Sequence, residues 1–219
     1  FNGNGTGGES ADGQNIACNY LSWADGAAYA DWAALRPMTE LEFEKACRGT
    51  AAAVADEYAW GSTNITQATG ITNSGAGSET ASNSGANCAY SDHASVQGPM
   101  RVGCFATSSS TRETAGATYY GIMEMSGNLR TICVTIGSSY GRSFTGSHGD
   151  GALDSTGNAN ASSWPEPSDN PDLTGAGFRG GSWFTDATTQ ARVSDREYAQ
   201  ASVLSRYFTS AFRCVRLAP

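Results

Sequence analysis

Charge is scarce in this 219-residue sequence, and lysine is almost missing. Only 16% of the residues are charged, and Lys45 is the one lysine among 13 basic residues. The 21 acidic residues bring the formal net charge to −8. Because a nucleic-acid-binding surface needs a basic face to neutralise phosphates, we expect no nucleic acid among the partners of this chain.

Long apolar runs are missing as well. No segment approaches the roughly 18 apolar residues that a membrane-spanning helix needs, so we expect no membrane insertion in this segment. No basic stretch followed by an apolar one at the start indicates a signal peptide. The chain opens on Phe1 and a Gly/Asn-rich stretch, so we expect residues 1–20 to be a flexible lead-in and the chain to be a C-terminal fragment of a longer protein.

The usual catalytic and metal-binding motifs are also lacking. There are two histidines, and none of the six cysteines forms a CxxC pair, which argues against zinc. No GK[ST] pattern occurs. GxSxG spacing occurs at 137–141 and GxGxxG spacing at 3–8 and 175–180, but in a chain so rich in glycine and serine we give these matches no weight. We therefore predict no catalytic residue, no metal and no cofactor. His148 and Asp150 could share one ion, but we interpret them as a locally hydrogen-bonded loop. Six cysteines permit disulfides in 15 pairings.

Two helix signals stand near the front of the chain. Ser22 can cap a helix whose small and apolar residues recur at helical spacing from Trp23. Thr39 and Glu42 form a capping box for a second helix, which runs to about Arg48 and is stopped by Gly49.

Behind the helices, glycine-rich segments separate short apolar runs. Residues 61–98 are rich in Gly, Ser, Thr and Asn, which predicts a long irregular stretch. The runs predict short antiparallel strands at 100–105, 119–125, 132–136, 178–183 and 212–217. Two helices followed by scattered strands indicate an α+β fold.

The last 44 residues differ from the rest in charge. Six arginines face three acidic residues here, and several of the arginines stand beside apolar residues, which suggests bonded scaffold cations. Between them lie irregular runs that mix aromatic, β-branched and small polar residues. Such runs are either unspecific loops or a binding surface.

Five motifs occur in order at residues 36–49, 58–61, 120–129, 178–183 and 212–215. Together they resemble the formylglycine-generating-enzyme (sulfatase-modifying-factor) subtype of the C-type lectin fold. The resemblance implies one C-type-lectin-like domain over 1–219. The enzymes of this family activate oxygen on copper held by two nearby cysteines close to the C-terminus. Only Cys214 lies in that region and Cys133 falls on another predicted strand, so we predict that the chain is not an enzyme.

The segments 126–137, 141–151, 175–183, 191–196 and 212–216 carry a closer resemblance. They are typical of the variable proteins of diversity-generating retroelements. In these systems a reverse transcriptase copies a template with errors at adenines, so AAY codons scatter over many amino acids. The resemblance implies a variable region within about 125–219, displayed on a fixed frame that we assign to Trp183, Arg192, Arg196, Arg206 and Phe212.

The resemblance therefore predicts a non-enzymatic, receptor- or adhesin-like protein with a hypervariable ligand-binding surface. The implied partner is a protein or glycan on another cell or particle, and the implied location is a virion or an extracellular cell surface. The predicted ligand-binding residues are Phe184, Thr185, Asp186, Tyr198, Ser202, Val203, Leu204, Ser205, Tyr207, Phe208, Thr209, Ser210, Arg130, Thr131 and Tyr140.

Two alternatives stay open. The first is an oxidase of the formylglycine-generating type. The second is a carbohydrate-binding lectin of fixed specificity, although the paired EPN or QPD and WND motifs of calcium-dependent lectins are absent.

Overall fold

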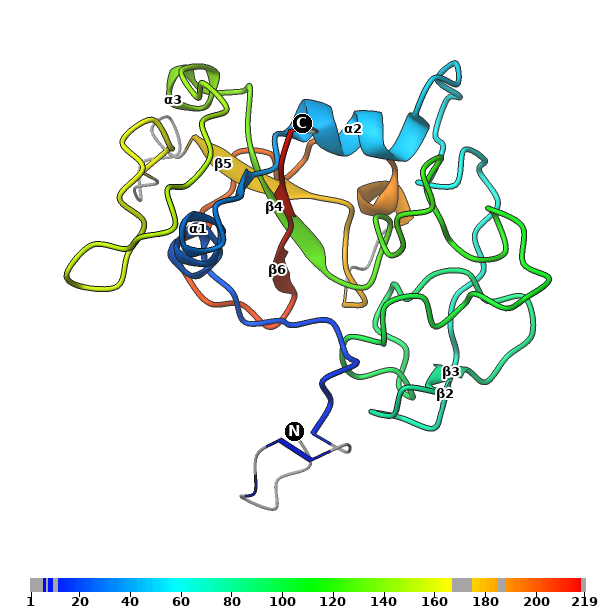
Figure 1. Cartoon of the computed structure of the whole chain (residues 1–219). Helices are drawn as coiled ribbons and strands as arrows, with labels where there is room; N and C mark the ends of the chain where they lie inside the picture. Colours follow the sequence, from blue (N-terminus) through cyan, green and yellow to red (C-terminus); the bar gives the residue numbers. More distant parts are fainter. Residues whose placement is uncertain (1–5, 7, 10–11, 167–174, 185–187, 218–219) are drawn as a thin grey trace. The chain divides into compact units, whose positions relative to one another are not determined.

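A computed structural model describes residues 6, 8, 9, 12–166, 175–184 and 188–217 (Figure 1). The chain folds into two compact units, and each unit is assembled from three separated segments. Unit 1 comprises 1–18, 45–129 and 180–195, and unit 2 comprises 19–44, 130–179 and 196–219. The prediction of a single domain over 1–219 stays a prediction.

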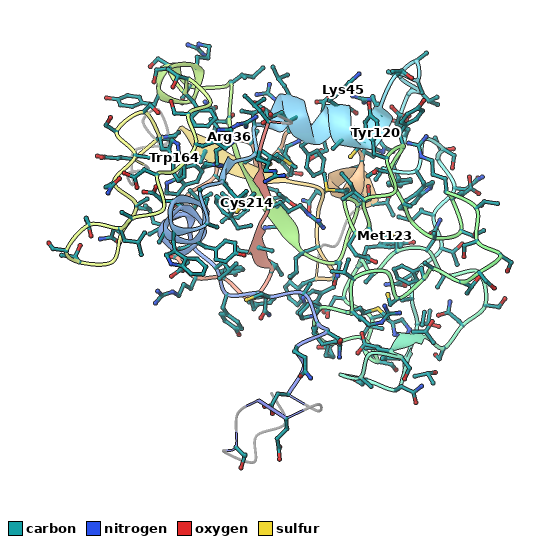
Figure 2. All side chains as sticks on the ribbon, in the orientation of Figure 1. Arg36, Lys45, Tyr120, Met123, Trp164 and Cys214 are labelled. Carbon is teal, nitrogen blue, oxygen red and sulfur yellow. The ribbon has the colours of Figure 1, made fainter. Side chains whose placement is uncertain are left out.

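The sheet of unit 2 has three strands in the order β5-β4-β6. Its central strand β4 (Arg130–Val134) pairs antiparallel with β5 (Ala176–Arg179) and parallel with β6 (Ser210–Phe212). The last pairing corrects our expectation of antiparallel strands only. A second, two-stranded sheet joins β1 (Arg36–Pro37) to β7 (Cys214–Val215), and Figure 2 labels Arg36 and Cys214 on these two strands.

The first predicted helix is confirmed as α1 (Trp23–Trp32). Ser22 caps it: the Ser22 hydroxyl accepts a hydrogen bond from the Asp25 amide, and the Asp25 carboxylate accepts one from the Ser22 amide at 2.9 Å. This reciprocal arrangement satisfies amides that the first helical turn leaves without partners.

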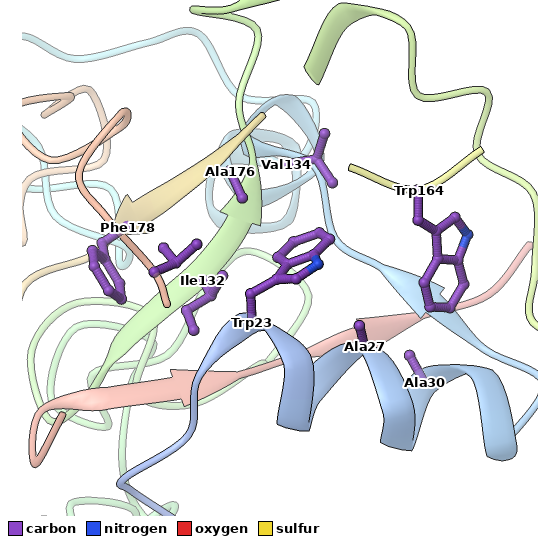
Figure 3. Close-up of a cluster of buried hydrophobic side chains, with 9 residues drawn as sticks. Trp23, Ala27, Ala30, Ile132, Val134, Trp164, Ala176 and Phe178 are labelled. Atoms are coloured by element: carbon purple, nitrogen blue, oxygen red, sulfur yellow. The ribbon is translucent and has the colours of Figure 1, made fainter. Parts of the chain in front are cut away.

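One face of α1 covers the core of unit 2. Trp23, Ala27 and Ala30 are buried on that face, and Figure 3 shows Trp23 beside Ile132 of β4. The Trp23 ring meets Phe212 of β6 edge to face, with ring centroids 5.7 Å apart. Aromatic burial of this kind contributes much of the energy of a small core.

The second helix, α2 (Glu40–Arg48), also begins where the capping box predicts. The Thr39 amide donates to the Glu42 carboxylate at 3.0 Å, and the Glu42 amide donates to the Thr39 hydroxyl at 3.2 Å. Gly49 follows with a left-handed φ of 62°, a conformation that favours glycine and ends the helix. The short helix α3 (Ser139–Arg142) completes the α-helices of the described residues.

Unit 1 contains little regular structure. Residues 61–98 are irregular as predicted, apart from the two-residue strands β2 (Ile71–Thr72) and β3 (Thr80–Ala81). Asn128 is buried in this unit, and its side chain accepts a hydrogen bond from the Met100 amide at 2.8 Å and donates one to the Met100 carbonyl at 3.0 Å. The 3-10 helix η2 (Thr188–Ala191) also belongs to this unit.

Two of the predicted strands are wrong. Residues 100–105 and 119–125 form turns with isolated bridges at Arg101 and Met123. Gly103 and Gly121 take a φ of 77°, which an extended strand cannot accommodate. The prediction over 178–183 is right only as far as Arg179, because Gly180 and Gly181 turn left-handed. The run 212–217 is divided between β6 and β7.

None of the six cysteines, all of which lie among the described residues, forms a disulfide. Cys88 is fully buried in unit 1, and its thiol donates to the Ser126 carbonyl at 3.2 Å. None of the helices among the described residues combines the length and the apolar character that crossing a bilayer requires.

Candidate functional site

The 202–210 loop runs into β6 of unit 2, which begins at Ser210. Hydrogen bonds to its main-chain oxygens hold its path. Its Val203 carbonyl accepts from the Trp23 amide at 2.8 Å, and its Tyr207 carbonyl accepts from the Tyr20 amide at 3.1 Å. The Asn19 side chain donates to the Phe208 carbonyl at 2.9 Å. These bonds fix the path of the loop whatever its own side chains are, because the loop contributes main-chain oxygens.

Most side chains of this loop point outward. Leu204 is 39% exposed and Tyr207 is 51% exposed, and Ser202 and Ser205 are exposed as well. Phe208 is half-buried and stacks on Tyr207, with ring centroids 4.8 Å apart. The loop therefore presents two aromatic rings, one aliphatic side chain and two serine hydroxyls, a mixture that protein-binding loops use for contact area and adaptable hydrogen bonds.

Four predicted ligand-binding residues are buried, and this corrects the prediction. Val203 is fully buried in the core cluster of unit 2, while Thr131, Thr209 and Ser210 are at most 2% exposed. Thr131 lies on the central strand β4, and Ser210 opens β6, where the pleat directs side chains into the core. These residues were predicted because they are among the amino acids that AAY codons can yield. That criterion does not reveal which side chains face the core.

Arg206 fastens the outer part of the loop to α1. Its Nε donates to Asp25 Oδ2 at 2.8 Å and its Nη2 donates to the other carboxylate oxygen. This paired hydrogen bond to Arg206 holds the pKa of Asp25 well below its usual range. Asp25 is therefore the partner of Arg206 in the framework role that we expected for this arginine, although the Arg206 side chain is largely exposed.

Tyr198 and Arg130 lie together beside the sheet of unit 2. The Arg130 guanidinium stacks over the Tyr198 ring at 4.4 Å from its centroid. The Tyr198 carbonyl accepts from the Phe178 amide at 2.8 Å. Gly177 makes this close approach possible, because a Cβ there would lie 2.1 Å from the Ala199 carbonyl oxygen. Both predicted residues are half-buried rather than fully displayed.

The remaining predicted residues are not gathered on this loop. Tyr140 is exposed on α3 of unit 2. Phe184 belongs to unit 1, where it is 41% exposed and meets Trp183 edge to face at 5.4 Å. Thr185 and Asp186 lie outside the described residues.

A buried carboxylate that the sequence did not single out organises the arginines of unit 2. Glu40 accepts from Arg179 Nη1 at 2.7 Å and from Arg196 Nε and Nη2, both at 2.8 Å. It also accepts from the Ile136 amide at 2.7 Å. Burial pushes the pKa of Glu40 upward, but the bonds from Arg196 and Ile136 and the two arginine charges outweigh it, so the pKa is lowered.

The cysteines do not fit the copper site that the family resemblance implies. Among the described residues no group of three or more His, Cys, Asp or Glu side chains is placed to hold a metal. Cys214 is the one cysteine of the C-terminal segment, and burial raises the pKa of its thiol to about 11. A thiolate pair close to the C-terminus is therefore not offered, and no reaction step is derived through copper. His148 Nε2 accepts from the Leu217 amide at 3.2 Å.

Fold and site together define an α+β protein that carries a main-chain-anchored loop with outward side chains. The sequence matches the family of sulfatase-modifying factor enzyme 1-like domains over residues 4–218. The chain belongs to this family, whose members include the formylglycine-generating enzyme and non-catalytic proteins. No curated protein matches the sequence.

Proposed function

We propose that this chain is a non-enzymatic binding protein whose 202–210 loop presents a variable surface to a protein ligand. This proposal rests on one observation: main-chain hydrogen bonds fix the path of the loop, while its exposed side chains take no part in those bonds. Main-chain carbonyls of Val203, Tyr207 and Phe208 hold the path, while Leu204 and Tyr207 face solvent. Side chains can therefore change without loss of the fold, which is what a surface of changing specificity needs.

The chemistry of the displayed residues favours a protein partner. The exposed groups are aromatic, aliphatic and hydroxyl, and the charge of Arg206 is matched by Asp25. Tyrosine supplies contact area at low entropic cost, and serine supplies adaptable hydrogen bonds. A loop held in advance also avoids the ordering cost of binding. We further propose the C-type lectin subtype, diversification by a retroelement and display on a virion or cell surface.

Two buried hydroxyls support diversification. Thr209 Oγ1 and Ser210 Oγ have no hydrogen-bond partner among the described residues. A buried unsatisfied hydroxyl costs about 1–3 kcal/mol, so selection for stability alone favours an apolar residue there. A copying process that scatters adenine-rich codons over many amino acids would leave such residues in place.

Two displayed libraries test the binding role. One randomises the exposed positions 204 and 207, and the matched control randomises the buried positions 131 and 203. Most members of the first library should fold and should yield binders against unrelated proteins, whereas most of the second should fail to fold. Equal loss of folded protein in both libraries would contradict the proposal.

Two further measurements test the remaining parts of the proposal. A reverse-transcriptase gene beside the coding DNA, with a near-copy of the codons for about 125–219 that differs at adenines, is expected. Oxygen consumption with copper and a cysteine-containing peptide should stay at the level of buffer. Copper-dependent turnover would instead establish the oxidase.

A further inference from the structure

A hollow of about 430 Å³ lies on unit 2, and none of its lining residues belongs to the 202–210 loop. Its apolar lining comes from Trp23 and Ala27 of α1 and from Ala161 and Trp164 of the segment that follows α3. Figure 3 shows the two indoles on either side of Ala27 and Ala30. We call this hollow the indole pocket.

The charges of the indole pocket have one sign. Asp154 and Glu166 line it, and no lysine, arginine or histidine does. Asp154 Oδ1 accepts hydrogen bonds from Thr156 Oγ1 and the Thr156 amide, both at 2.8 Å, and from the Asn158 amide at 2.9 Å. The amides of Asn158 and Thr156 and the Thr156 hydroxyl lower the pKa of Asp154, so this carboxylate is ionised at neutral pH. The pocket thus repels anions and attracts cations.

One unused donor adds a second requirement. The Trp23 side chain is 5% exposed and lines the pocket, no acceptor for its indole N–H lies in the described part of the chain, and this nitrogen is not among the fully buried atoms. In Figure 3 its nitrogen is turned toward Trp164, whose own indole N–H donates to the Ser147 carbonyl at 2.8 Å. A tryptophan N–H in an almost buried ring ordinarily finds an acceptor. A ligand oxygen in the pocket would supply it.

We propose that the indole pocket binds a small organic ammonium ion that also carries an oxygen acceptor. The carboxylates of Asp154 and Glu166 attract the charge, and the carbon substituents pack on the alanines and indoles. The π electrons of tryptophan add to the attraction for a cation. The ligand oxygen accepts from Trp23. The two carboxylates of this site lie outside the 202–210 loop, and the proposal does not rest on the binding role proposed for that loop, although the Trp23 amide also donates to the Val203 carbonyl.

Two probes of equal shape isolate the charge. Choline and 3,3-dimethylbutan-1-ol both carry a hydroxyl, and they differ in the positive nitrogen that replaces a carbon. Titration is followed by tryptophan fluorescence and by NMR shifts of the indole N–H groups. We expect saturable binding of choline at least about tenfold tighter than binding of the neutral alcohol.

Variants that keep the local hydrogen bonds test the two carboxylates. Asp154→Asn retains an Oδ1 acceptor for the Thr156 and Asn158 amides, and Glu166→Gln keeps the side-chain length. The double variant should bind choline about tenfold more weakly, with an unchanged melting temperature and near-UV spectrum. Asp150→Asn removes an exposed charge of the same segment that does not line the pocket, and it should have little effect.

Three outcomes would overturn the proposal. Equal binding of choline and the neutral alcohol would show that charge is not recognised. An equal effect of D150N and of the double variant would show a diffuse field without a site. The absence of saturable binding of choline would show that the pocket takes no ammonium ion. None of these results bears on the loop libraries.

Discussion

Glu40 is the residue on which the arginine framework of unit 2 depends. Its carboxylate is 3% exposed and receives hydrogen bonds from Arg179 and Arg196. A buried ion pair of this kind does not guarantee stability, because both charges lose their water. Removal of one partner is nevertheless costly, since it leaves the other charge buried and unmatched.

Glu40→Gln is therefore expected to lower the free energy of unfolding by about 3–5 kcal/mol. The amide leaves the Arg179 charge without its buried counter-ion. Urea denaturation followed by circular dichroism measures the loss. Glu44→Gln is the matched control, because Glu44 also bonds Arg179 at 2.8 Å but is 28% exposed. It should cost about 1 kcal/mol or less. Equal losses in the two variants would refute the central role of Glu40.

Thr209 is a residue whose replacement should raise the free energy of unfolding, in contrast to Glu40. Its hydroxyl is buried without a hydrogen-bond partner among the described residues, whereas its main-chain carbonyl accepts from the Arg130 amide at 2.9 Å. Thr209→Val keeps the shape and the main-chain bond and removes the unsatisfied hydroxyl. We expect a gain of about 1 kcal/mol in the free energy of unfolding. A loss of similar size would show that the hydroxyl is in fact bonded, for example to a buried water.

The position of α1 against β6 depends on a glycine in the helix, which has no side chain to keep the two elements apart. Gly26 is buried in the middle of this helix, and a Cβ there would lie 2.0 Å from a ring carbon of Phe212. Glycine inside a helix is unfavourable by itself. Its use here is the close approach of α1 to β6.

Gly26→Ala sets two effects against each other. The gain in helix propensity is about 1 kcal/mol, and the overpacking against Phe212 costs about 1–3 kcal/mol. We expect a net loss of stability, measured as a lower urea midpoint. Gly98→Ala is the control, since nothing lies within 4 Å of a Cβ at that position. A gain in the Gly26 variant equal to the helix term would show that Phe212 moves aside without cost.

The 202–210 loop makes a second prediction at the scale of an element, from two adjacent residues. Val203 is fully buried and Leu204 is 39% exposed. Val203→Ala should lower the free energy of unfolding by about 2 kcal/mol because it opens a cavity in the core. Leu204→Ala should change it by less than about 0.5 kcal/mol. Thermal unfolding of both variants is the measurement, and the reverse order would place the wrong side chain outside.

At the scale of the whole molecule, acid should unfold the protein through its paired carboxyl groups. The pKa values of Asp25, Glu40 and Glu42 are all lowered, chiefly by hydrogen bonds from Arg206, Arg196 and Arg36 against the effect of burial. In the unfolded chain these groups titrate near their ordinary values of about 4. The unfolded state therefore binds more protons below about pH 5, and stability is lost as the pH falls.

The urea midpoint should accordingly be constant between about pH 7 and pH 6 and should fall steadily below about pH 5. Glu40→Gln should show a shallower fall than the unmodified chain, because one of the titrating groups is gone. A midpoint that stays constant down to pH 3 would contradict the lowered pKa values.

The sequence by itself determined the local structure of this protein. Ser22, Thr39 and Glu42 placed the starts of both long helices, because a capping box is satisfied by neighbours three residues apart. The glycine-rich character of 61–98 likewise predicted its irregular path. Strand prediction over 100–105 and 119–125 failed, since apolar content carries no information about the left-handed φ of Gly103 and Gly121.

Only the tertiary structure decided which residues meet and which face solvent. Val203 and Leu204 come from the same irregular run, and burial against the core separates them. Glu40 and Arg196 are 156 residues apart in the sequence, and no local sequence pattern indicates that they form an ion pair. Exposure and long-range pairing depend on how segments pack, and packing is a property of the folded chain that no local pattern records.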